Sequence, residues 1–555
     1  LEAEAIAEMA ATQNFLGNRE LAIIFYKQAI EVFESRRDDV EAILGVSANK
    51  SQLFSPVYRR LSDLLLTEDR PAEAQQTVDL LKVQEVEEYL GDVRGNSGQN
   101  GGNLNRTVET LPQEQAILAT YDPLRDQAIA LGKELLALRR TPSVELTPAQ
   151  QDRIKELTQI QQDITRQFSE FSRSPEVKNA LQNISDTARE QNLSLNTLRS
   201  IADNLRQLDE PAVILYPLVL EDRLELIVAS PFAPPIRRTV DVSRTELNAT
   251  IVEMRQALTT ERHNTANEPA RKLYNWLIAP IQGDLQAVGA TTIIYAPDDQ
   301  LRYVPLSVLN DGDRWLIEKY RVSNITAASL TDFTSQRPNV LNILAGAFTE
   351  GEYAFHAGTR DFAFEGLPFA GKEVNNIASA IPATTTLFDG NFSKADTVPQ
   401  MDSFNIVHLA THAAFVPGKP EDSFILFGNG DRTTLGEVKD SWFLTNVDLI
   451  VLSACQTAVG GELGNGEEIL GFGYLMQDAG ARAAIASLWS VSDGGTQALM
   501  NRFYEQLNTG NVSKAEALRQ AQIAMIKGEL TVDGSVGDTA NPYYWSPFIL
   551  IGNGL

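Results

Sequence analysis

Three short apolar runs in the last third of the chain have polar side chains at their ends, and they constrain the fold most. Phe404–His412 ends on a histidine, Asp448–Cys455 ends on the only cysteine among 555 residues, and Ala483–Trp489 is followed by Ser490 and Asp493. Such runs are typical of buried parallel strands. Because ligands bind outside the carboxyl ends of parallel strands, we expect the imidazole, the thiol and the carboxylate to meet in one crevice.

A thiol and an imidazole in one crevice are the groups that a cysteine peptidase requires. A thiol with the ordinary pKa of about 8.5 is mostly protonated at neutral pH, whereas the thiolate is the nucleophile. A neighbouring imidazole favours the thiolate and can protonate the leaving amine. We therefore predict that Cys455 is the nucleophile, that His412 is the general acid/base, and that the backbone N–H groups of Ala413 and Cys455 bind the oxyanion.

Other interpretations of these residues stay open. A lone cysteine in an intracellular protein is usually a small buried residue. His408 lies inside the first apolar run, which favours a core histidine with satisfied hydrogen bonds. A metal-dependent hydrolase would use His408, His412 and Cys455 as ligands, but a fourth ligand is not evident. We therefore predict no metal and no other cofactor.

The runs and their surroundings contain a series of motifs: His408-Leu-Ala-Thr-His412-Ala, Leu452-Ser-Ala-Cys455-Gln-Thr, Gly466-Glu-Glu-Ile-Leu-Gly-Phe, Ala479-Gly480-Ala481, Ser487-Leu-Trp-Ser-Val-Ser-Asp493 and Pro542-Tyr-Tyr-Trp545. In this order they resemble the motifs of CHAT domains, which are caspase-like peptidases of the group that includes separase and are often attached to tetratricopeptide repeats. The resemblance covers roughly residues 205–555. One position departs from the family, which usually has glycine after the catalytic histidine, where this chain has Ala413; alanine keeps the N–H but lacks the backbone freedom of glycine. The resemblance implies a Cys–His dyad without a third catalytic residue.

Asp493 is the predicted substrate-binding residue. Its segment resembles the separase segment whose aspartate receives a basic side chain. A carboxylate in a partly desolvated pocket can hold a guanidinium by charge-assisted, bidentate hydrogen bonds, which predicts cleavage after arginine or lysine. The alternative is that Asp493 caps the helix that follows it, and the two roles can coexist.

The rest of the chain divides into a helical part and a part that alternates strands and helices. Residues 1–95 show helix pairs with the small-residue spacing of tetratricopeptide repeats, and residues 96–208 form a glycine- and asparagine-rich linker and further helices. Residues 209–338 are a predicted non-catalytic subdomain, and residues 339–555 the catalytic one. The predicted fold is a TPR-like α-helical region followed by a caspase-like α/β fold with two subdomains.

Composition limits the compartment and the partners. The 73 acidic and 47 basic residues give a formal net charge of −26, which repels nucleic acid and anionic membranes, so we predict neither as a direct partner. No run approaches 18 apolar residues. A single cysteine fits a reducing compartment, so we expect a cytoplasmic protein. Because two partial repeats are too few for a free-standing array, we expect an activator protein to dock on the helical region.

Together these features predict a cysteine endopeptidase that cleaves protein substrates after arginine or lysine and is regulated through its helical region. The competing hypothesis is a catalytically weak or inactive TPR–CHAT scaffold for protein–protein interaction. Ala413 favours the scaffold, whereas the retained Cys–His pair argues against it.

Overall fold

Two compact units make up the chain, and the boundary between them falls inside one helix. Unit 1 contains Leu1–Val78 and Asn105–Leu198, and unit 2 contains Asp79–Leu104 and Arg199–Leu555. Helix α5 (Pro71–Leu90) therefore begins in unit 1, and its residues from Asp79 onward belong to unit 2. The domain boundaries drawn from the sequence stay a prediction. The computed structural model describes residues 2–35, 54–90, 108–141, 146–175, 177, 179–181, 183–184, 196–208, 210–260, 266–334, 340–357, 360–453, 456–457, 463–532 and 539–554.

Unit 1 is helical, which confirms the predicted N-terminal helical region. Its long helices are α1 (Glu2–Phe15), α2 (Arg19–Ser35), α4 (Ser55–Thr67), the start of α5, α6 (Pro112–Arg140) and α7 (Pro148–Arg173). Helix α1 packs against α2, α2 against α4, and α6 against α7.

A cluster of buried charges lies inside unit 1. Lys27 Nζ lies 2.5 Å from Glu73 Oε2 and 2.8 Å from Glu114 Oε2, and Arg70 binds both of these carboxylates and Glu20. The Lys27 and Arg70 side chains are fully buried. Buried charges are tolerated when they are paired. This cluster therefore links α2, α5 and α6, and removal of one of its charges would leave another buried charge without full compensation.

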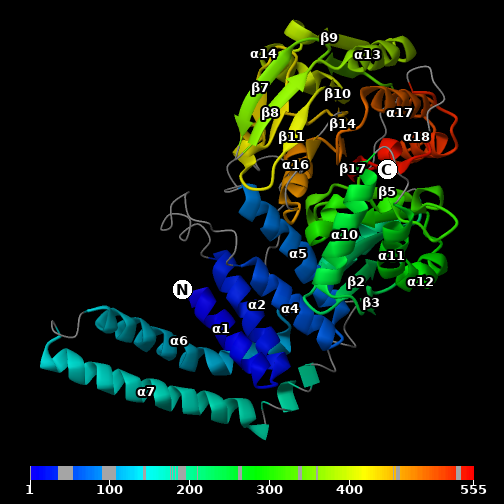
Figure 1. Ribbon diagram of the computed structural model, residues 1–555. Helices are drawn as coiled ribbons and strands as arrows, with labels where there is room; N and C mark the ends of the chain where they lie inside the picture. Colours follow the sequence, from blue (N-terminus) through cyan, green and yellow to red (C-terminus); the bar gives the residue numbers. More distant parts are fainter. Residues whose placement is uncertain are drawn as a thin grey trace. The chain divides into compact units, whose positions relative to one another are not determined.

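Unit 2 is built on a mixed, mostly parallel sheet, as predicted from the alternation of strands and helices (Figure 1). Within the described residues, the sheet has eleven strands in the order β3-β2-β1-β4-β5-β17-β16-β14-β10-β6-β9. Their bounds are β1 (Ala212–Val219), β2 (Leu224–Ala229), β3 (Ile236–Val240), β4 (Thr292–Tyr295), β5 (Arg321–Asn324), β6 (Ile343–Ala347), β9 (Thr384–Phe388), β10 (Ile406–Ala410), β14 (Leu449–Leu452), β16 (Ala483–Ser487) and β17 (Phe548–Gly552).

Strand direction in the sheet reverses between β16 and β17, and again on either side of β2. Strands β16, β14, β10, β6 and β9 are parallel to one another, whereas β17 runs antiparallel to β16 and parallel to β5. Every residue of β6, β10, β14, β16 and β17 is buried, as expected for strands with both faces covered. The principal helices of this unit are α10 (Arg244–Leu258), α11 (Asn267–Leu277), α13 (Pro368–Ala380), α16 (Glu467–Asp478), α17 (Asp493–Leu507) and α18 (Lys514–Ile526).

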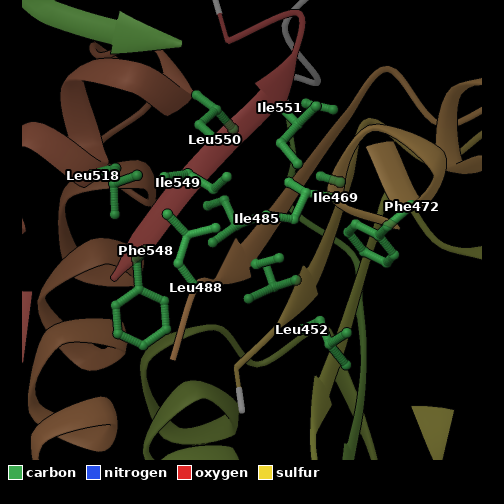
Figure 2. Packing of buried hydrophobic residues seen from close by; sticks show 14 of the residues in the cluster. Leu452, Ile469, Phe472, Ile485, Leu488, Leu518, Phe548, Ile549, Leu550 and Ile551 are labelled. Carbon is green, nitrogen blue, oxygen red and sulfur yellow. The ribbon is translucent and has the colours of Figure 1, made fainter. Parts of the chain in front are cut away.

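The hydrophobic core continues from the strands into the flanking helices. Figure 2 shows Ile485 of β16 and Ile549 of β17 packed between side chains of the neighbouring helices, among them Leu518 of α18 and Phe472 of α16. This packing fixes the strand ends on which the candidate site depends.

Two small sheets lie beyond the main one. One has the order β13-β12-β11-β15 and the other is a hairpin of β7 (Glu352–Ala357) and β8 (Arg360–Glu365). Within the described residues, every helix is too short or too polar to cross a bilayer. The strands of the first small sheet are β11 (Ala413–Phe415), β12 (Phe424–Leu426), β13 (Arg432–Thr434) and β15 (Gln456–Thr457).

Candidate active site

Three neighbouring parallel strands end at one edge of the main sheet. Strand β14 pairs with β10 on one side and with β16 on the other, all in the same direction. His412 follows β10, Ser453 follows β14, and Asp493 follows β16. These three residues line a common cavity of about 30 Å³, enough for about one water molecule. The structure therefore brings the predicted imidazole and carboxylate together at the end of the strand that precedes Cys455.

The His412 imidazole is held by a backbone carbonyl. Its Nε2 donates to the carbonyl oxygen of Glu365 over 2.8 Å, at the end of β8. Because a carbonyl oxygen can only accept, Nε2 carries a proton and the neutral ring has its lone pair on Nδ1. The Phe364 ring lies 4.8 Å from the imidazole, centroid to centroid, and the Phe348 ring meets it edge-on at 5.6 Å. Burial lowers the pKa of His412, and the hydrogen bond to Glu365 opposes that shift.

Cys455 lies outside the described residues, but its described neighbours on both sides are hydrogen-bonded near His412. Before it, Leu452 pairs with Leu409, and Ser453 N donates to Leu409 O over 3.1 Å. After it, Gln456 pairs with Ala414. The chain that flanks the cysteine therefore runs parallel to the chain that flanks the histidine.

Asp493 is the first residue of α17 and contacts a second helix. Its Oδ2 accepts a hydrogen bond of 2.6 Å from the backbone N–H of Phe369, at the start of α13. The cap of α17 is instead Ser492, whose side chain accepts from Gly495 N over 3.1 Å. The carboxylate of Asp493 thus stabilises the N-terminus of α13 while it lines the cavity beside His412.

A comparison with protein families decides the family. A model described as "CHAT domain" matches residues 267–553, more than half of the chain. The chain belongs to the CHAT domain family. Its caspase-like α/β fold is the predicted one.

Solved structures give distant matches. The Arg specific cysteine proteinase gingipain R is 12% identical, with a TM-score of 0.32, over 56% of this chain and 74% of that chain. Gingipain RgpB of Porphyromonas gingivalis, in a complex of its pro- and mature domains, is 10% identical, with a TM-score of 0.33, over 56% and 76%. The Saccharomyces cerevisiae separase–securin complex is 9% identical, with a TM-score of 0.41, over 99% of this chain and 53% of that chain. These similarities carry no residue role over to this protein. No curated protein matches the sequence.

Ala413, which follows His412 in the CHAT domain, does not need the left-handed backbone conformation that favours glycine. Ala413 opens β11 and pairs with Ile425, and Leu426 N donates to His412 O over 2.9 Å. The positive-φ residues other than glycine, within the described part of the chain, are all aspartates, so Ala413 is not among them. The freedom of glycine is therefore not used at this position.

His408 is a buried residue of the CHAT domain core. Its Nε2 lies 2.7 Å from Glu373 Oε1, and its Nδ1 lies 3.0 Å from the Tyr504 hydroxyl. The buried position agrees with the core interpretation, whereas the contact of Nε2 with Glu373 lacks hydrogen-bond geometry, so the expected set of satisfied hydrogen bonds is not complete. Across the residues that the structure describes, no group of three or more His, Cys, Asp or Glu side chains is arranged to hold a metal ion.

The sequence did not reveal Glu365 and Phe369, which hold His412 and Asp493 in the CHAT domain through backbone atoms. The β7–β8 hairpin that ends at Glu365 has a weak signature, aromatic residues at alternate positions in each strand: Tyr353 and Phe355 in β7, and Phe362 and Phe364 in β8. That alternation predicts a hairpin, but it does not predict which carbonyl faces the imidazole.

Proposed function

We propose that this protein is a cysteine endopeptidase in which Cys455 is the nucleophile and His412 the general acid/base. The observation that carries the proposal is the pairing of both flanks of Cys455 with both flanks of His412. The protonated Nε2 of His412 supports it further, because the basic lone pair is then on Nδ1. Membership of the CHAT family, whose fold is a peptidase fold, supports the same reaction class.

The proposed reaction begins with proton transfer from the Cys455 thiol to His412 Nδ1. The thiolate attacks the substrate carbonyl, and the backbone N–H groups of Ala413 and Cys455 stabilise the oxyanion. His412 then gives its proton to the leaving amine as the peptide bond breaks and an acyl-enzyme thioester forms. Water, deprotonated by the same imidazole, hydrolyses the thioester and restores the thiol.

The carbonyl of Glu365 orients the imidazole in this mechanism. It fixes the ring through Nε2 in the neutral state and accepts the same N–H when His412 becomes an imidazolium. Because burial lowers the pKa of His412, the ring is neutral at pH 7 and ready to act as a base. A backbone carbonyl thus does the orienting that a carboxylate does in a catalytic triad.

We propose that Asp493 selects substrates with arginine or lysine before the cut. Its carboxylate lines the same small cavity as His412, and Asp493 opens the helix that follows β16, the strand next to the one that precedes Cys455. A carboxylate can accept several hydrogen bonds, so it can hold a guanidinium and the Phe369 N–H together. Protein substrates and an activator that docks on the helical region complete the proposal.

The test compares Cys455→Ala, His412→Ala and the double variant on a protein substrate. Because the two groups act as a unit, each single variant should lose nearly as much kcat/KM as the double variant. Full turnover by Cys455→Ala would overturn the proposed mechanism. The scaffold hypothesis predicts instead that the wild-type protein binds partners but leaves every substrate intact.

A further inference from the structure

From Asp79 to Val86 every residue of α5 is buried, and one side of this stretch carries polar groups that bind the rest of unit 2. Asp79, Lys82, Glu85 and Tyr89 recur at spacings of 3, 3 and 4 residues, which places them on one side of a helix, and all are buried. Asp79 accepts hydrogen bonds from the Tyr216 hydroxyl and from backbone N–H groups. Lys82 Nζ lies 2.5 Å from Asp298 Oδ1. The first half of this face thus attaches α5 to the sheet.

The second half of the face leads to the chain that follows Cys455. Glu85 is paired with Arg302, which lies in the short helix η4 (Asp299–Tyr303) and is buried. Arg302 Nη1 donates to the carbonyl oxygen of Asn465 over 2.8 Å. Gly466, which precedes α16 with φ of +75°, packs against Arg302 so closely that a Cβ there would lie 2.6 Å from the Arg302 Cβ. Arg302 therefore joins α5 to the start of α16.

Tyr89, at the end of α5, contacts two further elements of the site. Its ring packs on Gly471 of α16, where a Cβ would lie 2.6 Å from the ring. Its hydroxyl lies 3.4 Å from Ser423 Oγ, which accepts from Val416 N over 2.9 Å. Val416 directly follows β11, the strand that pairs with β15 next to Cys455.

We propose that the segment Asp79–Leu90 of α5 is a positioning element of the active site, and that Arg302 is the positioning residue through which it acts. The proposal rests on the proposed role of Cys455. The CHAT match begins at residue 267, so this element lies outside the matched region. The active site then depends on a helix that lies some 180 residues before the first residue of the family match.

The geometry at Arg302 requires a guanidinium. One Nη binds the Glu85 carboxylate while the other binds the Asn465 carbonyl, so the planar fork bridges two groups at fixed positions. A lysine keeps the charge but presents one compact ammonium, which does not reproduce that bridge. Arg302→Lys should therefore lose the hydrogen bond to the Asn465 carbonyl before α16, while the Glu85 carboxylate keeps a cationic partner.

The experiment compares Arg302→Lys and Glu85→Gln with a matched control in the full chain. The control is Arg237→Lys, because Arg237, like Arg302, binds a buried carboxylate through its guanidinium, with contacts of 2.9 and 2.6 Å to Glu225. The readouts are kcat and KM on a peptide substrate, the rate of iodoacetamide alkylation against pH, and the thermal midpoint. Cys455 is the only cysteine, so every alkylation event reports on it.

Arg302→Lys should lower kcat by about 10- to 100-fold, since a displacement of about 1 Å can cost a hundredfold. The alkylation profile should move toward that of a free thiol, with a pKa of about 8.5. Glu85→Gln should act in the same direction and add little to Arg302→Lys. Arg237→Lys should change only the thermal midpoint.

Two outcomes separate this proposal from the proposed function. If Arg302→Lys and Glu85→Gln have the same kcat and the same alkylation profile as the control Arg237→Lys, the positioning role is wrong. If the wild-type protein cleaves nothing but Arg302→Lys still shifts the alkylation profile, the positioning role stands and the peptidase proposal fails. Should Arg302→Lys unfold the chain, Glu85→Gln alone decides.

Discussion

Gly366→Ala is expected to disable the site from a position that bears no functional side chain. Gly366 follows Glu365, whose carbonyl holds the His412 imidazole. A Cβ at this position would lie 2.3 Å from the carbonyl oxygen of Thr349 and 2.6 Å from backbone atoms of Glu350. Backbone atoms cannot rotate away as a side chain can, so the chain at Glu365 must move.

The displacement sets the size of the effect. Ordinary contacts begin near 3.4 Å, so the backbone must open by about 1 Å. A shift of that size can lower the rate by about a hundredfold. The lost hydrogen bond to Glu365 would also remove about 1 kcal/mol that holds the imidazole in its orientation. Because the bond to Glu365 raises the pKa of His412, its loss should also move the acidic limb of kcat/KM to lower pH.

The assay measures kcat/KM against pH on a peptide that ends in arginine, together with the thermal midpoint. Gly283→Ala is the control, because a Cβ there meets nothing within 4 Å. Gly366→Ala should lose about 10- to 100-fold in kcat/KM, and Gly283→Ala almost nothing. A folded Gly366→Ala protein with the kinetics of the control would refute the orienting role of Glu365.

Three further predictions concern substrate choice, stability and pH. Asp493→Asn should reduce the preference for arginine over an uncharged residue by about 10- to 100-fold, as expected for a charge-assisted bond of about 1.5–3 kcal/mol; a preference that survives in a peptide library contradicts the role of Asp493. Lys27→Met should lower the free energy of unfolding by about 3–5 kcal/mol, because the buried carboxylates of Glu73 and Glu114 then share the single charge of Arg70. Lys155→Met, at an exposed ion pair, should change it by less than about 1 kcal/mol, and equal effects in urea titrations would refute the argument from burial. Since partial burial lowers the pKa of His412, the acidic limb of kcat/KM should have its midpoint below 6.5, and a midpoint above 6.5 would contradict the half-buried, uncharged imidazole.

The strands that carry the site were predictable because buried parallel strands are uniformly apolar. Leu449–Leu452 and Ala483–Ser487 read as strands for that reason, and the rule for ligands at strand ends then placed His412 beside Asp493. The structure agrees with both steps. Candidate site residues that act through their side chains at strand ends can therefore be recognised in the sequence.

The parts that escaped prediction act through the backbone or through tertiary packing. Glu365 serves by its carbonyl, which every residue type has, so its identity carries no signal. Helix α5 has no clear apolar face in its sequence although most of it is buried, so the sequence does not tell that Asp79–Leu90 belongs to unit 2. The pairing of Glu85 with Arg302 joins positions more than 200 residues apart, a separation that periodicity does not address.

The central claim is that His412 activates Cys455 toward a carbonyl next to a basic side chain. The most direct measurement is mass spectrometry of the native protein after reaction with a peptidyl acyloxymethyl ketone that ends in arginine. We predict one adduct on the peptide that contains Cys455, lost in His412→Ala and at least tenfold slower with a norleucine-ending reagent. Absence of the adduct in the folded wild-type protein, or its formation at an unchanged rate in His412→Ala, would contradict the account.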